Sequence, residues 1–105
     1  MKPSESVRQA FYFDPAAESE LAQAVAWYEK QSPGLGDEFV VEVKRTLRRN
    51  GEHPEAWPLL SARSRRCRTS RFPYGIVYQV TPKEVRILAI AHLHRRPGYW
   101  AEREA

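Results

Sequence analysis

Apolar residues in the first half of the chain recur at intervals of three and four, which predicts amphipathic helices. The first stripe consists of Ala17, Leu21, Ala24, Val25 and Tyr28, and the second of Leu35, Phe39, Val40, Val43 and Leu47. Asp14 before Pro15 is a typical helix start, since the aspartate can cap the first turn and proline lacks only an unneeded N–H there. The two stripes predict two successive helices.

The breaks between these patterns fix the connections. Ser32-Pro33-Gly34 ends the first helix, and the second begins almost at once, so the pair should fold back as a hairpin. Asn50-Gly51 predicts the end of the second helix. Before the hairpin, the aromatic run within Arg8–Phe13 predicts a first strand.

From Ser64 onward the period changes to about two, which is typical of strands. The sequence predicts strands over 65–72, 74–80 and 85–92, with a turn at Thr81-Pro82-Lys83-Glu84 between the last two. On the last strand, strict alternation would place Ile87, Ala89 and Ala91 on one side.

These elements predict an α+β fold: an N-terminal strand, a helical hairpin and a three-stranded antiparallel meander, with the helices packed on one face of the sheet. The 105 residues suit a single domain, for which we expect flexible ends at 1–7 and 101–105. A single cysteine excludes an internal disulfide framework, and the three histidines lack recognisable metal-ligand spacing. We therefore predict no metal and no cofactor. Without an apolar spanning run or signal peptide, the expected location is the cytoplasm, away from membranes.

Charge divides the chain into two unlike halves. Residues 1–43 carry three basic residues against eight acidic ones, a net charge of −5, whereas residues 44–105 carry fourteen against five, a net charge of +9. Such asymmetry favours a polyanionic or acidic partner for the second half. The candidate basic face comprises Arg63, Arg65, Arg66, Arg68 and Arg95. A charged edge strand that resists aggregation is the alternative interpretation of these arginines.

The C-terminal arginines, histidines and tyrosines also suit phosphodiester chemistry. Cleavage of RNA by its own 2′-hydroxyl needs a base, an acid and cations around the phosphate. His94 or His92 could exchange protons, Arg71 and Arg96 could hold the phosphate, and Tyr99 could serve as an acid or a stacking platform. The same surface also suits plain binding of nucleic acid or protein without catalysis.

The order of several short motifs resembles toxins of the RelE/ParE superfamily of bacterial type II toxin–antitoxin systems. They are Ala16–Leu21, Trp27-Tyr28-Glu29, the run from Pro33 to Phe39, Arg65-Arg66, the run from Arg71 to Tyr78, and the final His92–Trp100. The resemblance implies a growth-inhibiting protein that a cognate antitoxin neutralises. It also implies one of two targets: DNA gyrase for ParE-like members, or messenger RNA in the ribosome for RelE-like endoribonucleases.

The resemblance also implies roles for particular residues. In a RelE-like ribonuclease, the catalytic candidates are His94, Arg71, Arg96 and Tyr99. However, no lysine lies between Lys44 and Lys83, where several RelE-like enzymes keep a pair, and Pro97-Gly98 turns the chain just before Tyr99. A ParE-like inhibitor of gyrase is therefore the favoured hypothesis, with the ribonuclease as the alternative. In either case we expect the antitoxin to cover part of the basic face.

Overall fold

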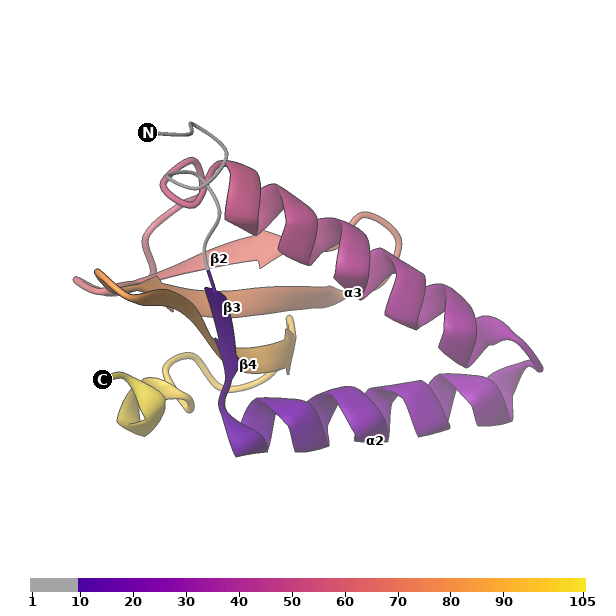
Figure 1. Cartoon of the computed structure of the whole chain (residues 1–105). Helices are drawn as coiled ribbons and strands as arrows, with labels where there is room; N and C mark the ends of the chain where they lie inside the picture. Colours follow the sequence, from indigo (N-terminus) through magenta and orange to yellow (C-terminus); the bar gives the residue numbers. More distant parts are fainter. Residues whose placement is uncertain (1–9) are drawn as a thin grey trace.

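The computed structural model describes residues 10–105, and its elements follow the predicted order (Figure 1). Strand β1 (Ala10–Phe13) leads into helices α2 (Pro15–Gln31) and α3 (Leu35–Glu52), which are followed by β2 (Ser64–Arg68), β3 (Tyr74–Val80) and β4 (Glu84–His92). A short 3-10 helix, η1 (Ala101–Arg103), closes the chain. The predicted flexible segment 1–7 and the first two residues of the predicted N-terminal strand lie outside the described residues.

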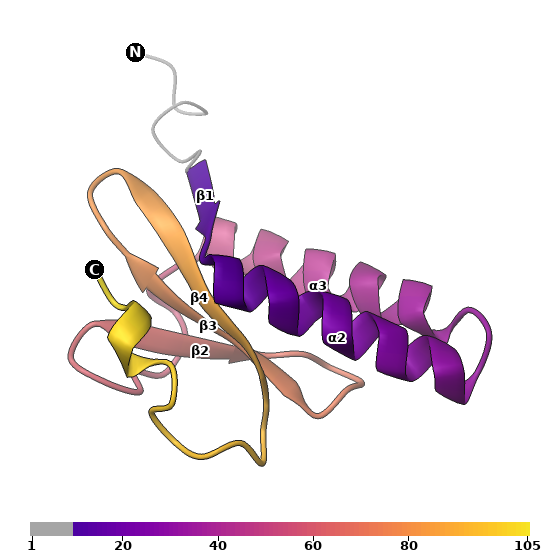
Figure 2. The same cartoon turned by 90° about the horizontal axis from the view of Figure 1, so that it is seen from below.

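The four strands form one sheet in the order β1-β4-β3-β2. Strands β2, β3 and β4 make the predicted antiparallel meander, and β1 joins β4 in parallel, with Ala10 opposite Glu84 and Phe13 opposite Ile87. The sheet is therefore mixed. Figure 2 shows the two helices side by side, with the tip of their hairpin extending beyond the sheet.

The helical hairpin is closed by Glu29. Its two carboxylate oxygens accept hydrogen bonds from the backbone N–H groups of Gly34 (2.9 Å) and Gly36 (3.0 Å), at the start of α3. Gly34 has φ of 89°, in the left-handed region that favours glycine. A Cβ atom at Gly36 would lie 2.8 Å from the Val25 carbonyl oxygen, so only glycine lets the helices approach this closely. The other predicted cap is also confirmed, since Asp14 accepts a hydrogen bond from Ala16 N–H.

Two predicted ends differ from the structure by more than one residue. Helix α3 continues past Asn50-Gly51 to Glu52, where His53 N–H donates to Arg49 O as the cap, and the Asn50 side chain is buried. Strand β2 ends at Arg68 rather than at residue 72. The chain turns there because Thr69 donates from its N–H to Tyr74 O and from its hydroxyl to Phe72 O, while Ser70 N–H donates to Glu42.

A β-bulge in β4 overturns the predicted alternation of Ile87, Ala89 and Ala91. Tyr78 pairs with Ile87 but the preceding Val77 pairs with Ala89, so one extra residue, Leu88, is inserted in β4. Ile87 therefore packs in the cluster beneath the helices, whereas Ala89 and Ala91 pack with Leu88 in a second cluster on the other face. The bulge therefore places Ile87 and Ile90 on the helix side of β4 and Leu88, Ala89 and Ala91 on the other.

The residues that follow β4, which we call the C-terminal segment (93–105), cover this second face. We call this face the outer face of the sheet. Trp100 packs there with Val77, Leu88, Ala89 and Ala91. Residues 101–105, for which we expected a flexible end, contain η1 and make hydrogen bonds to the sheet, among them Ala105 N–H to Gln79 (2.9 Å). In Figures 1 and 2 the segment lies against the sheet, on the side away from the tip of the helical hairpin.

Candidate functional site

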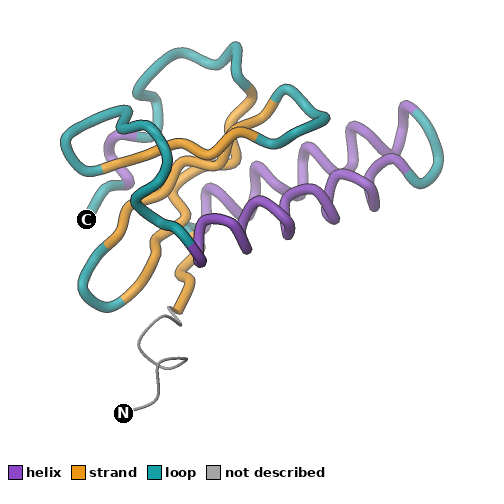
Figure 3. Tube along the Cα trace, turned by 90° about the horizontal axis from the view of Figure 1, so that it is seen from above, coloured by secondary structure: helices purple, strands orange, loops and turns teal. Residues whose placement is uncertain are grey.

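The loop that follows β4 forms a pocket of about 380 Å³ on the outer face. This outer-face pocket is lined by, among others, Leu60, Arg66, Val77, Ala91, Arg95, Arg96, Tyr99 and Trp100. Its lining thus combines an apolar floor with three guanidinium groups, and none of the lining residues within 10–105 is acidic. Figure 3 shows in teal the loops that connect the strands, with the helical hairpin extending beyond them.

Arg66 reaches the pocket from β2 because the neighbouring strand carries a glycine. On β3, Gly75 lies two residues from Val77, the partner of Arg66 in the strand pairing. A Cβ atom at Gly75 would lie 2.7 Å from Arg66 Cδ, so the stem of the arginine lies directly over the glycine. The glycine of the Phe-Pro-Tyr-Gly motif therefore allows Arg66 to lie across the sheet.

Glu20 of α2 holds in place the side of the pocket that contains Tyr99. Its Oε1 accepts from Ile90 N–H (3.0 Å) and its Oε2 from the Tyr99 hydroxyl (3.0 Å), while Arg103 binds both oxygens (3.1 Å each). Arg103 also donates to Leu88 O (2.9 Å). Because β1 pairs only with the first half of β4, Glu20 and Arg103 supply partners that a further strand would otherwise provide.

Tyr99 is therefore a structural hydrogen-bond donor in this arrangement. Burial, followed by the negative charge and hydrogen bond of Glu20, raises the pKa of Tyr99 to about 12. The guanidinium of Arg95 lies 3.9 Å from the centre of the Tyr99 ring. A neutral phenol whose proton points at a carboxylate is poorly placed to exchange that proton with a substrate.

A second set of hydrogen bonds anchors the chain end at Glu104 and Ala105. Glu104 accepts hydrogen bonds from the hydroxyls of Ser61 (2.7 Å) and Ser64, and these bonds hold the pKa of Glu104 below its usual value. Arg63 donates to Ala105 O (2.7 Å). The loop before β2 and the C-terminal segment are thus joined, and together they bound the pocket at Leu60, Ser61 and Ala101.

The histidines lie at the end of β4. His94 donates its backbone N–H to His92 Nδ1 (3.0 Å), and the two rings are 5.0 Å apart. His92 also packs edge-on against Tyr74. His92 lines the outer-face pocket, whereas the catalytic candidate His94 is exposed and does not contribute to its lining.

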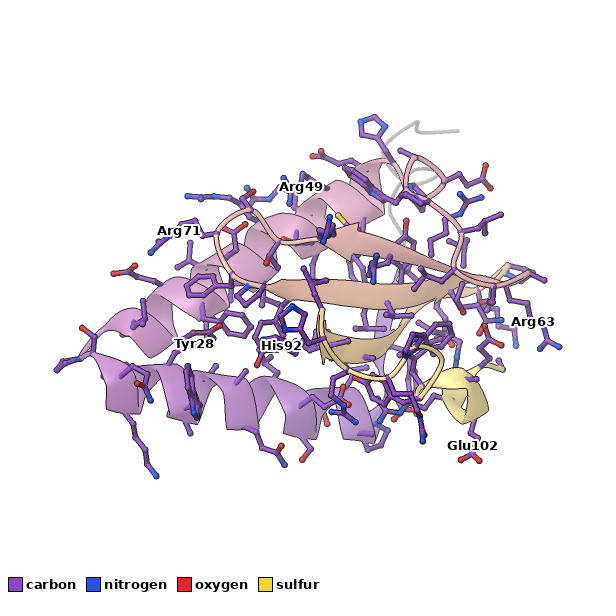
Figure 4. All side chains as sticks on the ribbon, turned by 180° about the vertical axis from the view of Figure 1, so that it is seen from behind. Tyr28, Arg49, Arg63, Arg71, His92 and Glu102 are labelled. Carbon is purple, nitrogen blue, oxygen red and sulfur yellow. The ribbon has the colours of Figure 1, made fainter. Side chains whose placement is uncertain are left out.

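Arg71 lies elsewhere. It pairs with Glu38 of α3 (2.8 Å) and lines a different pocket, formed mainly by α3. Figure 4 places Arg71 beside α3 and His92 at the end of the sheet facing α2. The structure therefore brings Arg96 and Tyr99 together in one pocket, leaves His94 outside it, and separates Arg71 from all three.

The five arginines of the predicted basic face point in different directions. Arg66 and Arg95 line the outer-face pocket, and Arg65 donates to Trp57 O (2.7 Å) in the loop beside β2. Arg68 is exposed at the end of β2. Arg63 lies at the opposite end of the molecule from Arg71 (Figure 4). The compact basic site therefore consists of Arg66, Arg95 and Arg96 rather than the whole predicted set.

Sequence reasoning missed Glu20, Ser61 and Glu104, which shape this site. Glu20 belongs to the acidic half of the chain and looks there like one more solvated helix residue. Its partners lie 70 to 83 residues away, so no local pattern identifies it. Within residues 10–105, no helix is long and apolar enough to cross a membrane, and no three potential ligands gather as a metal site.

The fold and pocket define a small α+β domain whose outer face is suited to an acidic partner. The family model described as the ParE toxin of the type II toxin–antitoxin system parDE matches residues 11–97. The chain belongs to this family.

A solved structure titled as the chromosomal ParDE toxin–antitoxin system from P. aeruginosa has a similar fold, with a TM-score of 0.72 and 17% identity over 82% of this chain and 97% of that chain. No relative was found among curated proteins.

Proposed function

We propose that this toxin inhibits growth by acting on DNA gyrase without enzymatic chemistry, and that a cognate antitoxin neutralises it. Membership of the ParE family supports the toxin–antitoxin part of this proposal. The antitoxin is further supported by the similar fold of a ParDE system, in which toxin and antitoxin are named together.

The observation that carries the non-enzymatic mechanism is the dispersal of the four catalytic candidates. Arg71 forms a salt bridge with Glu38 in a separate pocket, and the Tyr99 hydroxyl donates its hydrogen bond to Glu20. General acid–base catalysis needs groups within hydrogen-bond reach of one reacting centre. His94 and Arg96 alone supply neither a complete phosphate clamp nor an acid and base pair.

A supercoiling assay with purified toxin and DNA gyrase tests the target. We expect inhibition, with a stabilised cleavage complex, at micromolar toxin. The matched variant combines Arg71→Ala, His94→Ala, Arg96→Ala and Tyr99→Phe. If the mechanism is not enzymatic, this variant still prevents colony formation when it is induced without antitoxin. Absence of gyrase inhibition by the unaltered toxin would rule out this target.

One observation favours the alternative, a RelE-like endoribonuclease that cleaves messenger RNA on the ribosome. The outer-face pocket holds three guanidinium groups beside His92, a combination that can bind phosphate and exchange protons. Translating ribosomes incubated with the toxin distinguish the two mechanisms. Cleavage of the message in the ribosomal A site, abolished when His92→Ala is added to the fourfold variant, would establish the ribonuclease and remove the gyrase proposal.

A further inference from the structure

The second half of β4 presents an open backbone edge toward α2. Within residues 10–105, β1 pairs only with the first half of β4, so residues 88–92 have no neighbouring strand on that side. Glu20 accepts from Ile90 N–H at this edge. Because strand backbone groups two residues apart point the same way, Ile90 O and His92 N–H also face the edge. Neither has a hydrogen-bond partner among the described residues.

A groove of about 220 Å³ lies along this edge, between α2 and the end of β4. It shares His92 and Arg95 with the outer-face pocket, but its other side is formed by α2, which His92 faces in Figure 4. We call it the β4-edge groove, and its lining includes Gln23, Trp27, Tyr74, Ile90, His92 and Arg95. The open backbone edge is therefore part of the groove.

Aromatic rings line much of the groove. Trp27 is 58% exposed, the largest exposed fraction among the large apolar side chains of residues 10–105, and it contacts Tyr28 edge-on at 5.1 Å. The His92 ring accepts a hydrogen bond from His94 N–H (3.0 Å) and packs against Tyr74. These rings are positioned before a ligand binds, and an exposed indole beside a groove favours a flat partner that covers it.

The size and polarity of the groove indicate the kind of ligand. Its volume is below the range of about 300–1,000 Å³ that is usual for drug-sized ligands, so it suits one flat ring system. Ile90 O is an acceptor next to the donor His92 N–H, and the Watson–Crick edge of a nucleobase presents the complementary donor and acceptor. A peptide strand would need a longer open edge, but the flanking backbone groups of both residues are already bonded, to Glu20 and to Arg95.

We infer that the β4-edge groove binds the base of a nucleotide, which stacks on Trp27 and bonds through its Watson–Crick edge to Ile90 O and His92 N–H. Adenine fits this pattern, because its N6 amino group donates and its neighbouring N1 accepts. Arg95, which also lines the groove, supplies a cation for the phosphate. A free nucleotide and an unpaired base of a single strand share this chemistry. The inference goes beyond the proposed function and does not depend on the target of the toxin.

Amide NMR titration of the full chain tests the site, because chemical shifts report even weak binding. The probes are AMP, N6,N6-dimethyl-AMP, which cannot donate to Ile90 O, and ribose 5-phosphate, which lacks the base. We expect AMP to shift the amides of His92 and of residues 23–27. Loss of the donor or of the whole base should weaken binding about tenfold or more. N6-methyl-AMP, which retains one N–H, controls for the added bulk and should bind more tightly than the dimethyl form.

Matched variants locate the base. Trp27→Ala removes the stacking surface, and we expect about fivefold or greater loss of AMP affinity. Leu59→Ala is the control, because Leu59 is similarly exposed (56%) but lines a different pocket, and it should change affinity by less than about twofold. Both side chains are exposed, so unchanged amide shifts in α3 verify the fold of each variant.

A single-stranded oligodeoxyadenylate distinguishes the two sources of the base. Tighter binding than AMP, with shifts at the same amides, assigns the groove to a single strand, whereas equal or weaker affinity assigns it to a free nucleotide. The inference is overturned if AMP does not shift the His92 amide, if Trp27→Ala keeps full affinity, or if ribose 5-phosphate or the dimethyl form binds as well as AMP. Equal binding of N-acetylphenylalanine amide also overturns it, since the groove would then accept an aromatic side chain of a protein.

Discussion

Beneath the helices, the sheet packs against aromatic rings. On its outer face it is covered by the C-terminal segment, which packs through Trp100 and is anchored by polar contacts. Phe39 contacts the rings of Tyr28 and Phe72 on the helix side, at centroid distances of 5.2 and 5.0 Å. On the outer face, Glu20 and Glu104 anchor the C-terminal segment. Apolar packing is non-directional, but charged hydrogen bonds depend on geometry and solvent. The first face therefore maintains the fold, and the second shapes a surface that can respond to a partner.

The largest effect should come from removing a ring on the helix side. Phe39 is fully buried, and Phe39→Ala deletes a side chain at the centre of the aromatic cluster. We expect a loss of about 3–5 kcal/mol in the free energy of unfolding, measured by urea denaturation. Val41→Ala on the same helix is the control, because Val41 is half-exposed and should change stability by less than about 0.5 kcal/mol. Equal losses for both variants would refute the assigned core.

A smaller and more local effect should follow Glu20→Gln. The amide retains the size of the side chain but removes the charge that binds Arg103, so we expect a loss of about 1–3 kcal/mol. Hydrogen exchange should accelerate at Ile90 and across residues 97–103, while α3 remains protected.

Glu18→Gln is the matched control for this experiment, since Glu18 is exposed on the same helix. It should leave exchange unchanged throughout the chain. If Glu20→Gln instead accelerates exchange uniformly, the outer face is part of the cooperative core and the two faces do not differ in the proposed way.

The difference between the faces also explains how much could be predicted from sequence. The stripes that include Tyr28 and Phe39, and the Ser32-Pro33-Gly34 break, predicted the helical hairpin correctly because local periodicity reports which face of a helix is buried. The meander followed from the change to period two. These features are local, so the sequence carries them directly.

The outer face has no comparable local signal. The bulge at Leu88 reverses the alternation on β4, and no proline or glycine marks it within the strand. The tie between Glu20 and Arg103 spans 83 residues. Arg71 was predicted to hold a phosphate together with Arg96, but the early end of β2 turns it toward Glu38. Side-chain contacts over such separations depend on the tertiary fold, which no local pattern encodes.

The smallest effect should come from lowering the pH until the Glu104 carboxylate is protonated and its hydrogen bonds to Ser61 and Ser64 are lost. Hydrogen bonds from Ser64 and Ser61 lower the pKa of Glu104 below its ordinary value of 4.5. A carboxyl group with a lowered pKa in the folded state contributes stability above its ordinary pKa, and this contribution disappears as the pH falls through the lowered value. Acidification below pH 4.5 should therefore loosen the chain end from the loop at Ser61.

The amide shifts of Arg63 and Ser64 provide the measurement, since both N–H groups donate to the Ser61 hydroxyl oxygen that Glu104 orients. They should show a transition below pH 4.5 that Glu104→Gln abolishes, while amides in the aromatic core do not follow it. Glu102 is close in sequence but points away from the sheet, so Glu102→Gln should preserve the transition (Figure 4). A transition that persists in Glu104→Gln would mean that another carboxylate controls this loop, and the chain end would then not be anchored by the bond that distinguishes the outer face from the helix side.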